Sequence, residues 1–264
     1  MKTAGTKTVT SRDNPVFKAL RLLAKDSREQ ARQRRTIIDG LHLVAEYRKK
    51  IGAPEQLVVS ESGERDAEIQ SLLAAHRDVE ILCLRDALFG EISGVATPVG
   101  LLAVIAIPAA PASPVAGSCV VLEAIQDAGN VGTILRTAAA AGVRDVVAGP
   151  GCAGVWTPRV LRAAQGAHFS LAIRPGDDLP AFVAGYAGLS VATLAAGGTS
   201  LYDLDLAGPV AWIFGNEGAG VSPQLAAAAS VGATIPMATE SESLNVAAAA
   251  AVCLFEAVRQ REKV

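Results

Sequence analysis

Two segments near the N-terminus, residues 14–25 and 41–50, carry apolar side chains at every third or fourth position. This spacing is typical of a helix with one buried face. Between them lies a basic run, Arg28 to Arg35. The pattern predicts two amphipathic helices flanking a positively charged stretch.

Shorter apolar runs follow. Residues 56–60 and 79–84 are expected to be strands on either side of a helix at 64–76, and residues 100–107 a buried strand. Together these elements predict a small α/β domain over residues 1–107.

From residue 118 onward, apolar runs alternate with helical spacings. Such alternation predicts a doubly wound, parallel α/β sheet. The expected strands are 119–124, 145–148, 169–173, 190–194, 210–214 and 233–235, and the expected helices are 131–141, 158–165, 179–187, 223–229 and 243–262.

Residues 108–117 (PAAPASPVAG) are rich in Pro, Ala and Ser and carry no charge. This composition predicts a semi-rigid linker, so the second domain is expected to span residues 118–264. The chain is 50% hydrophobic but only 4% aromatic, which favours helix-on-sheet packing in an α/β fold.

Secretion, membrane insertion and metal binding are not indicated. The N-terminus is polar and lacks the apolar core of about 7 to 15 residues of a secretion signal. The longest apolar stretch, 99–111, is too short to cross a bilayer. The four cysteines and three histidines show no metal-ligand spacing. We therefore expect a cytoplasmic protein without a metal or a membrane anchor.

Charge is unevenly distributed. Residues 1–50 hold 13 Lys and Arg against 5 Asp and Glu, a net charge of +8, whereas the whole chain carries −2. A basic segment on an acidic body is typical of a protein whose one part meets a polyanion. An ordinary solvated helix surface would have the same composition.

Three polar, glycine-bearing segments lie where predicted strands end: 127–136 (DAGNVGTILR), 214–222 (FGNEGAGVS) and 235–245 (IPMATESESLN). The carboxyl ends of parallel strands are where α/β sheets bind ligands. Each segment alone could be a tight turn. Together they supply the donors and acceptors that a site for a hydroxyl and a charged cofactor needs: Asn130, Arg136, Glu217, Ser243 and Asn245.

A competing motif is the G-x-G-x-x-G of Gly149, Gly151 and Gly154, with Asp177 further along. Such a motif can bind a dinucleotide when a helix opens immediately after it. Here Trp156, Thr157 and Pro158 intervene, so this interpretation is disfavoured.

The three polar segments resemble the signature motifs of the SpoU branch of the SPOUT methyltransferases, knotted enzymes that methylate RNA ribose 2′-hydroxyls. GNVGTILRTAAAAGV is similar to the first motif, IFGNEGAGVS to the second and IPMATESESLNVAAAAAVCLFE to the third. TPRVLRAAQGAHF resembles the segment between the first and second motifs, and the resemblance covers about residues 119–261.

The N-terminal half, from SRDNPVFKALRLLAKDSREQARQRRTIIDG onward, resembles the L30e-like substrate-binding domain of many family members. It departs from the family in having Asp39-Gly40 where Glu-Gly is usual, and no aromatic residue near Thr36. The resemblance implies a small α/β L30e-like domain that binds RNA. Its basic run supplies the candidate contacts Arg32, Arg34 and Arg35.

The resemblance also implies a deep trefoil knot in the C-terminal α/β-knot domain, S-adenosylmethionine as cofactor, and a homodimer formed through that domain. Arg162 would reach RNA phosphate across the dimer interface, although a surface ion pair is an equal alternative. The cofactor would be contacted by Leu194, Gly215, Ile235, Met237 and Leu244.

For the reaction, Arg136 is the residue that the resemblance makes essential. In the family, the matching arginine has been proposed as the general base. A guanidinium stays protonated in proteins, however, and therefore cannot readily accept a proton. We therefore favour a grip on the adjacent phosphate and stabilisation of oxyanion charge. Asn130 and Asn245 would position the hydroxyl, Glu217 would hold backbone or orient Arg136, and Ser243 would share this task or cap the last helix.

Three function classes remain open at this point. The first is an RNA ribose 2′-O-methyltransferase, with ribosomal RNA favoured over transfer RNA as the substrate. The second is a non-catalytic RNA-binding protein of the same fold. The third is a nucleotide-dependent oxidoreductase that uses the Gly149 motif. Calorimetry with S-adenosylmethionine, RNA and NAD distinguishes them.

Overall fold

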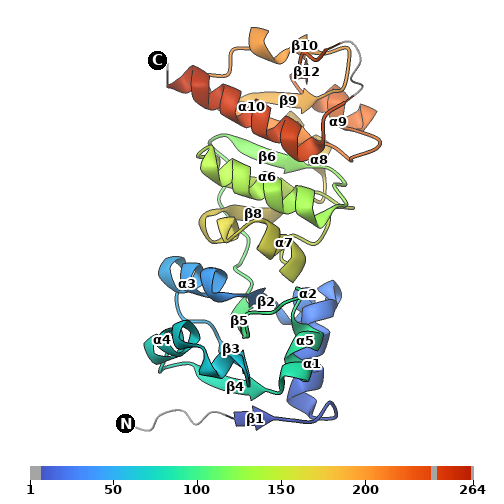
Figure 1. The fold of residues 1–264 in the computed structure, drawn as a ribbon. Coiled ribbons are helices and arrows are strands. Elements are labelled where there is room, and N and C mark those ends of the chain that lie inside the picture. Colours follow the sequence, from blue (N-terminus) through green and yellow to red (C-terminus); the bar gives the residue numbers. More distant parts are fainter. Residues whose placement is uncertain (1–6, 239–242, 263–264) are drawn as a thin grey trace. The chain divides into compact units, whose positions relative to one another are not determined.

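The computed structural model describes residues 7–238 and 243–262. The chain forms two compact units: unit 1 comprises the residues up to Ala109 together with Trp156–Phe169, and unit 2 comprises Ala110–Val155 and Ser170 onward. Figure 1 shows both units as helices around a sheet. The α/β class predicted from the pattern is confirmed.

Unit 1 contains a five-stranded mixed sheet in the order β1-β4-β3-β5-β2. The pairs β1–β4 and β3–β4 are parallel, whereas β3–β5 and β2–β5 are antiparallel. Its strands are β1 (Lys7–Val9), β2 (Arg35–Asp39), β3 (Gln56–Ser60), β4 (Glu80–Leu84) and β5 (Leu101–Ala106).

Both faces of this sheet are covered by helices because its strands are apolar on both sides. One buried cluster joins Leu43 and Tyr47 of α3 to Leu57 of the sheet, and the other joins Phe17 and Leu20 of α1 to the opposite face. The helices are α1 (Pro15–Lys25), α2 (Ser27–Gln33), α3 (Leu41–Lys50), α4 (Ala67–Ala75) and α5 (Asp86–Ile92).

A short segment from the C-terminal half of the sequence also belongs to unit 1. Helix α7 (Pro158–Ala163) contributes Leu161 to the core, and the Phe169 ring meets Tyr47 edge-on with centroids 5.3 Å apart. The prediction of a strand beginning at Phe169 was wrong, because burial of this ring holds residues 167–170 in a 3-10 turn. Strand β8 (Ala172–Pro175) begins afterwards.

Unit 2 contains a seven-stranded sheet in the order β10-β12-β9-β11-β6-β7-β8, and all its recorded strand pairs are parallel. The parallel pairing predicted from the alternation is thus confirmed. Besides β8, its strands are β6 (Cys119–Leu122), β7 (Asp145–Ala148), β9 (Leu189–Thr193), β10 (Thr199–Ser200), β11 (Val210–Phe214) and β12 (Val231–Thr234).

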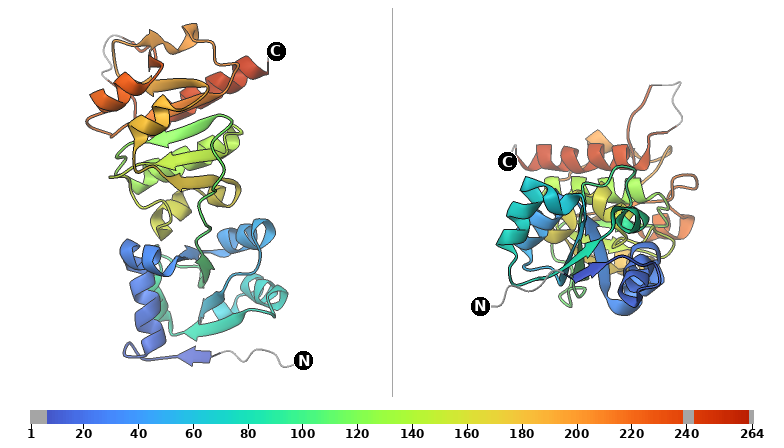
Figure 2. Two further views of the ribbon diagram at one scale, coloured as in Figure 1. Left: turned by 180° about the vertical axis from the view of Figure 1, so that it is seen from behind. Right: turned by 60° about the horizontal axis from the view of Figure 1, so that its bottom comes forward.

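Helices cover both faces of the unit 2 sheet. On one face, α6 (Ala128–Ala140) and α10 (Val246–Arg261) lie side by side, as Figures 1 and 2 show. On the other face, Leu179 and Val183 of α8 (Leu179–Ala184) and Leu225 of α9 (Pro223–Ala228) pack on the alternate strand residues. Because the recorded strand pairs are all parallel, the strands of this sheet point their carboxyl ends to the same edge.

Residues 110–117, which the sequence predicts to be a linker, contact unit 2 at three points. Arg174 Nη1 donates to the Ser113 carbonyl (2.6 Å), the Tyr186 hydroxyl donates to the Gly117 carbonyl (2.8 Å), and Val115 packs on the core. These contacts reduce the length of chain that is free to act as a linker.

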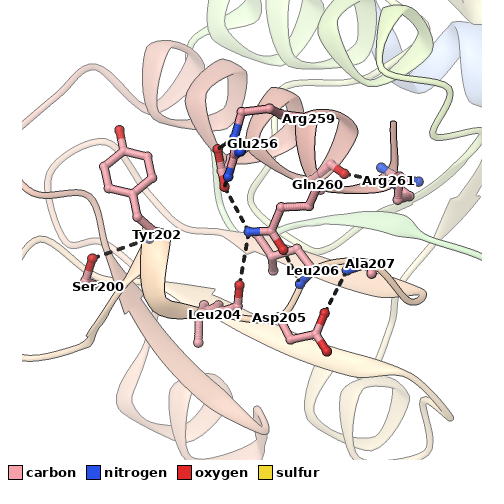
Figure 3. Close-up of polar contacts among 11 residues, drawn as sticks. Ser200, Tyr202, Leu204, Asp205, Leu206, Ala207, Glu256, Arg259, Gln260 and Arg261 are labelled. Atoms are coloured by element: carbon pink, nitrogen blue, oxygen red, sulfur yellow. Dashed lines mark hydrogen bonds and ion pairs between the residues drawn. The ribbon is translucent and has the colours of Figure 1, made fainter. Parts of the chain in front are cut away.

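The C-terminal end of α10 is fastened to the loop that leads into β11 (Figure 3). Gln260 Nε2 donates to the Leu204 carbonyl (3.1 Å), and Gln260 Oε1 accepts from the Leu206 N–H (2.8 Å). Arg259 and Gln260 both donate to the buried Glu256 carboxylate. The register of α10 along the sheet is set by these bonds, and with it the position of the helix N-terminus.

Five helices and strands were not predicted: the short strands β1 and β10, helix α2 within the basic run, strand β2 behind it, and helix α5. The apolar pattern did not reveal strand β2, because the strand begins at the charged Arg35 and ends at the charged Asp39. Only its three central residues are buried. No helix among the described residues is long and apolar enough to cross a membrane.

Candidate functional site

The first site segment forms the beginning of α6. The Asp127 carboxylate caps the helix by accepting from the Asn130 N–H (2.9 Å). The chain reaches this cap through Ala124, whose φ of +52° lies in the left-handed region. This conformation costs a residue with a side chain roughly 1–2 kcal/mol, so neighbouring contacts must hold the turn.

Glu217 lies in the loop after β11 and receives three hydrogen bonds from this turn. Its Oε2 accepts from the Gln126 N–H (3.1 Å), and its Oε1 accepts from the Asp127 N–H (3.0 Å) and from Asn130 Nδ2 (3.1 Å). The carboxylate thus joins the second polar segment to the first, as their positions at neighbouring strand ends predict.

The third segment reaches the same place through Asn245. Its Nδ2 donates to Asn130 Oδ1 (3.0 Å), and its Oδ1 accepts from the Ala247 and Ala248 N–H groups at the start of α10. Asn245 is therefore the cap of this helix, and the suggestion that Ser243 caps it was wrong. Ser243 lies exposed two residues earlier.

The hydrogen bonds determine the orientation of both amides. Asn245 Oδ1 must face the helix N–H groups, so its Nδ2 points to Asn130. Asn130 then accepts with Oδ1 and donates with Nδ2 to Glu217. Each Nδ2 carries one further N–H, so toward a ligand the two amides act as donors.

Arg136 lies on α6 beyond Asn130, roughly 9 Å further along the helix axis and about 120° around it. Its side chain is exposed and makes no hydrogen bond or ion pair with the part of the chain that the structure describes. The guanidinium is thus available to an outside partner, but among the described residues no hydrogen bond or ion pair joins it to Asn130, Glu217 or Asn245.

The residues predicted to bind the cofactor gather at three neighbouring strand ends. Strands β12, β9 and β11 are adjacent and parallel, so Leu194, Gly215 and Ile235 follow them at the same edge. The Leu194 N–H donates to the Ala233 carbonyl (2.8 Å). Met237 is half-buried, and Leu244 is 42% exposed although its side chain is apolar.

The close packing of its own loop requires a glycine at position 215. A Cβ at this position would lie 2.2 Å from the backbone of Gly220 and Val221. The space that a side chain would need is taken by the protein's own loop rather than left for a cofactor. A similar close approach joins Gly198 to the Gly232 carbonyl, 2.7 Å from the position of a Cβ.

The Gly149 loop packs on the turn that follows β6. The Gly149 N–H donates to the Leu122 carbonyl (2.8 Å), and the Ala153 N–H donates to the Ile125 carbonyl (2.8 Å). A Cβ on Gly149 would lie 2.5 Å from the Leu179 side chain. Gly149 thus serves internal packing, and the next helix, α7, begins only at Pro158.

The candidate RNA contacts all lie in unit 1. Arg32 donates to Glu29 and Arg35 to Glu55, whereas Arg34, at the C-terminal cap of α2, donates to the Ile107 carbonyl (3.4 Å). Arg162, on α7, packs against Gly94, and its Nη1 is buried without a hydrogen-bond partner among the described residues.

Sequence reasoning missed residues that support the site rather than line it. Asp127 could have been recognised, because an Asp just before a helix is a common N-cap. Glu123 and Asn216 gave no such signal, because the bonds that join them to other segments span 99 and 92 positions in the chain. Among the described residues, no group of three His, Cys, Asp or Glu side chains is placed to hold a metal ion.

The charge state of Glu217 is set by opposing effects. Burial acts to raise its pKa, but the hydrogen bonds from the Asp127 N–H, the Asn130 amide and the Gln126 N–H outweigh it and lower the pKa below the ordinary 4.5. The carboxylate therefore stays ionised at neutral pH and is a weak base.

This lowered pKa predicts a pH-dependent stability. A group with a depressed folded-state pKa stabilises the fold above its unfolded pKa, and this stabilisation is lost as pH falls through the folded pKa. We expect Glu217→Gln to have a Tm a few degrees below that of the unaltered protein at about pH 7, and the difference to shrink as the pH falls below the ordinary pKa of 4.5 and through the lowered pKa of Glu217. Thermal melts across this range measure it, and a Tm difference independent of pH would contradict it.

Comparison with known proteins extends these observations. Residues 117–255 match the SpoU rRNA Methylase family, and residues 14–103 match the MRM3-like substrate binding domain. The chain is 30% identical over 231 residues to the 23S rRNA (guanosine(2553)-2′-O)-methyltransferase RlmP of Bacillus subtilis, covering 86% of this chain and 90% of RlmP.

Two solved structures are similar over almost the whole chain. A putative RNA methyltransferase of the TrmH family from Porphyromonas gingivalis has a TM-score of 0.80 and 31% identity, covering 96% of this chain and 100% of its own. The SpoU methyltransferase AviRb from Streptomyces viridochromogenes, in complex with the cofactor AdoMet, has a TM-score of 0.83 and 26% identity, covering 95% and 100%. The chain belongs to the SpoU rRNA methylase family and has the SPOUT methyltransferase fold.

Proposed function

We propose that this protein transfers the methyl group of S-adenosylmethionine to a ribose 2′-hydroxyl of ribosomal RNA. The observation that carries the proposal is the chain of hydrogen bonds from Asn245 through Asn130 to Glu217, which unites the three family motifs at the carboxyl edge of one parallel sheet. Ribosomal RNA is favoured because RlmP, which spans both units, is named for 23S rRNA.

The strand ends suit S-adenosylmethionine. Leu194, Ile235, Met237 and the exposed Leu244 supply apolar cover for an adenine ring, and Gly215 keeps the backbone of the neighbouring loop close. When bound, the cofactor supplies a methyl group already activated by the sulfonium, so the protein need only orient the acceptor and stabilise charge.

Each candidate catalytic residue has a distinct task in this proposal. Asn130 and Asn245 direct their remaining amide N–H groups to the ribose oxygens, and the exposed Ser243, two residues before Asn245 in the chain, shares this task. Glu217 holds the turn rather than taking the proton, because its pKa is lowered. Arg136 grips the phosphate next to the target ribose and stabilises charge that develops on the attacking oxygen.

We assign RNA binding to Arg32, Arg34 and Arg35 of the proposed N-terminal domain (residues 1–107), and to Arg162. Exposed ion pairs contribute little to stability, so phosphates can replace Glu29 and Glu55 as partners of Arg32 and Arg35. With residues 108–117 as linker and 118–264 as catalytic domain, affinity and chemistry would lie on separate parts of one chain, which we place in the cytoplasm. The close approaches at Gly198 and Gly215 suit the trefoil knot implied by the resemblance.

The proposal is tested by incubating the protein with radiolabelled S-adenosylmethionine and either ribosomal or transfer RNA. We expect label on ribosomal RNA in a dinucleotide that resists alkaline hydrolysis, the mark of a 2′-O-methyl group. Label on transfer RNA alone would favour the alternative substrate. RNA binding without transfer would indicate a non-catalytic protein, and NAD binding by calorimetry an oxidoreductase.

We further propose a homodimer formed through the outer face of α10. Apolar side chains lie along this face: Phe255 is 48% exposed, and Val252 and Ala248 lie one and two turns before it. An exposed phenylalanine in such surroundings is typical of an interface. We expect Phe255→Asp to convert a dimer into a monomer in light scattering.

A matched control is Leu22→Asp, which alters an apolar side chain of 47% exposure on α1 of unit 1. It should leave the dimer intact. A dimer that persists in Phe255→Asp would place the interface elsewhere, and a monomeric unaltered protein would refute the homodimer.

A further inference from the structure

The loop of residues 215–222 is attached to the turn after β6 by side chains. The ladder between β11 and β6 ends at Phe214 and Leu122, and the last backbone bond runs from the Glu123 N–H to the Phe214 carbonyl (2.9 Å). Beyond it, every recorded hydrogen bond between the loop and residues 123–130 uses a side chain. The placement of Glu217 therefore depends on these side chains.

Asn216 is the first of them. Its Oδ1 accepts from the Gly218 N–H (2.9 Å) and the Ala219 N–H (3.0 Å), while its Nδ2 donates to the Ala124 carbonyl (2.8 Å). Its backbone N–H and carbonyl pair with Gly220. The amide can adopt only this orientation, because two N–H donors require the oxygen on one side and a carbonyl requires the NH2 on the other.

The partner of Asn216 is the residue where the turn is strained. Ala124 has a φ of +52°, which directs the chain so that the next N–H groups, those of Gln126 and Asp127, meet Glu217. Asn216 and Glu217 are consecutive in the loop. The first binds the turn at Ala124, and the second binds it two and three residues later. Asn130 receives its bond from Glu217 in the same arrangement.

The C-terminal end of the loop, at Ser222, is attached to Glu123, the residue before Ala124. The Glu123 carboxylate accepts from the Ser222 N–H (2.7 Å), and Ser222 caps α9. Glu123 and Ala124 thus hold both ends of the loop. The two attachments are independent, because they use different donors and acceptors.

We propose that Asn216 is a positioning residue of the methyl-transfer site, which holds Ala124 in its left-handed conformation so that Glu217 and Asn130 are aligned. Glu123 supports the same loop from its other end. The catalytic consequence rests on the proposed function, whereas the positioning itself does not. Neither residue is expected to touch the cofactor or the RNA.

Asn216→Asp tests the proposal with almost no change in size. The aspartate keeps the oxygen that accepts from Gly218 and Ala219 but replaces the NH2 group with a second oxygen facing the Ala124 carbonyl. The bond is lost while the carboxyl is ionised. A protonated carboxyl can donate, so the bond should return at low pH in Asn216→Asp but not in Asn216→Ala.

Amide hydrogen exchange of Gln126 and Asp127 is the direct readout, because exchange reports local opening. At neutral pH we expect the protection factors of both amides to fall at least about tenfold in Asn216→Asp. Protection should recover on acidification. Asn14→Asp, the same substitution at the cap of α1, serves as control and should leave both amides protected. Glu123→Ala is the second variant and should also expose them.

Single-turnover methyl transfer is measured in parallel at saturating RNA and cofactor. Displacement of a positioned group by about 1 Å can cost about 100-fold in rate, so we expect Asn216→Asp to be about 10- to 100-fold slower, with cofactor Kd within about threefold of the unaltered protein. A slower step with intact binding is the signature of positioning.

Unchanged protection of Gln126 and Asp127 in both Asn216→Asp and Glu123→Ala would overturn the proposal. Loss of protection spread equally over β9 and α10 would also overturn it, because it would indicate unfolding of unit 2 rather than release of the turn. If protection falls at the turn alone but the unaltered protein methylates no RNA, the positioning role stands and the proposed function fails.

Discussion

Replacing Arg136 with alanine is expected to reduce methyl transfer at saturating RNA and cofactor by at least about 100-fold, the usual effect of removing one donor that stabilises transition-state charge. The side chain is exposed and bonds to no described residue, so its loss should leave folding and cofactor affinity unchanged. Single-turnover rates and calorimetry measure the two quantities.

Arg144→Ala is the matched control, because Arg144 is another exposed arginine of unit 2 and carries none of the predicted roles. It should retain full activity. Turnover of Arg136→Ala at the rate of the unaltered protein would remove Arg136 from the site.

The salt dependence of RNA binding distinguishes the two roles of Arg136. A phosphate grip releases counterions, so Arg136→Ala should lower the slope of log affinity against log salt by about one. A residue that only removes a proton would leave this slope unchanged.

Replacing Gly215 with alanine is expected to abolish high-affinity cofactor binding and to destabilise unit 2. The new Cβ would lie 2.2 Å from the backbone of Gly220 and Val221, a distance that forces the loop to move. Overpacking of this kind costs about 1–3 kcal/mol, and the moved loop carries Asn216 and Glu217. We expect cofactor Kd to rise at least about tenfold, which corresponds to about 1.4 kcal/mol.

Gly208→Ala provides the control, because a Cβ on Gly208 would meet no atom within 4 Å. Its Tm and cofactor Kd should equal those of the unaltered protein. If Gly215→Ala bound the cofactor normally, the close packing of this loop would not be needed for the site.

Several elements follow from local sequence alone. The strands at 56–60, 145–148 and 210–214 and the helix at 41–50 have the predicted bounds, because short apolar runs and helical spacing are properties of the segment itself. The placement of polar residues after β6, β11 and β12 also follows from the alternation, since parallel strands end at one edge.

Local patterns failed where distant contacts determine the structure. Phe169 was predicted to begin a strand, but packing against Tyr47 holds it in a turn of unit 1. Capping of the last helix was one of the two roles considered for Ser243, but the helix begins three residues later and Asn245 caps it. The Phe169 ring is held by a distant residue, and Asn245 also bonds to Asn130, which is 115 positions away.

The sequence by itself determined the α/β class, the parallel sheet and the edge at which the polar segments collect, because these depend on periodicities within short windows. Only the tertiary structure decided which of those side chains meet. Asn130 and Asn245 are 115 positions apart, and Asn130 and Glu217 are 87 apart. Bonds over such separations form only when strands from distant parts of the chain become neighbours, and strand order is set by the packing of the whole sheet.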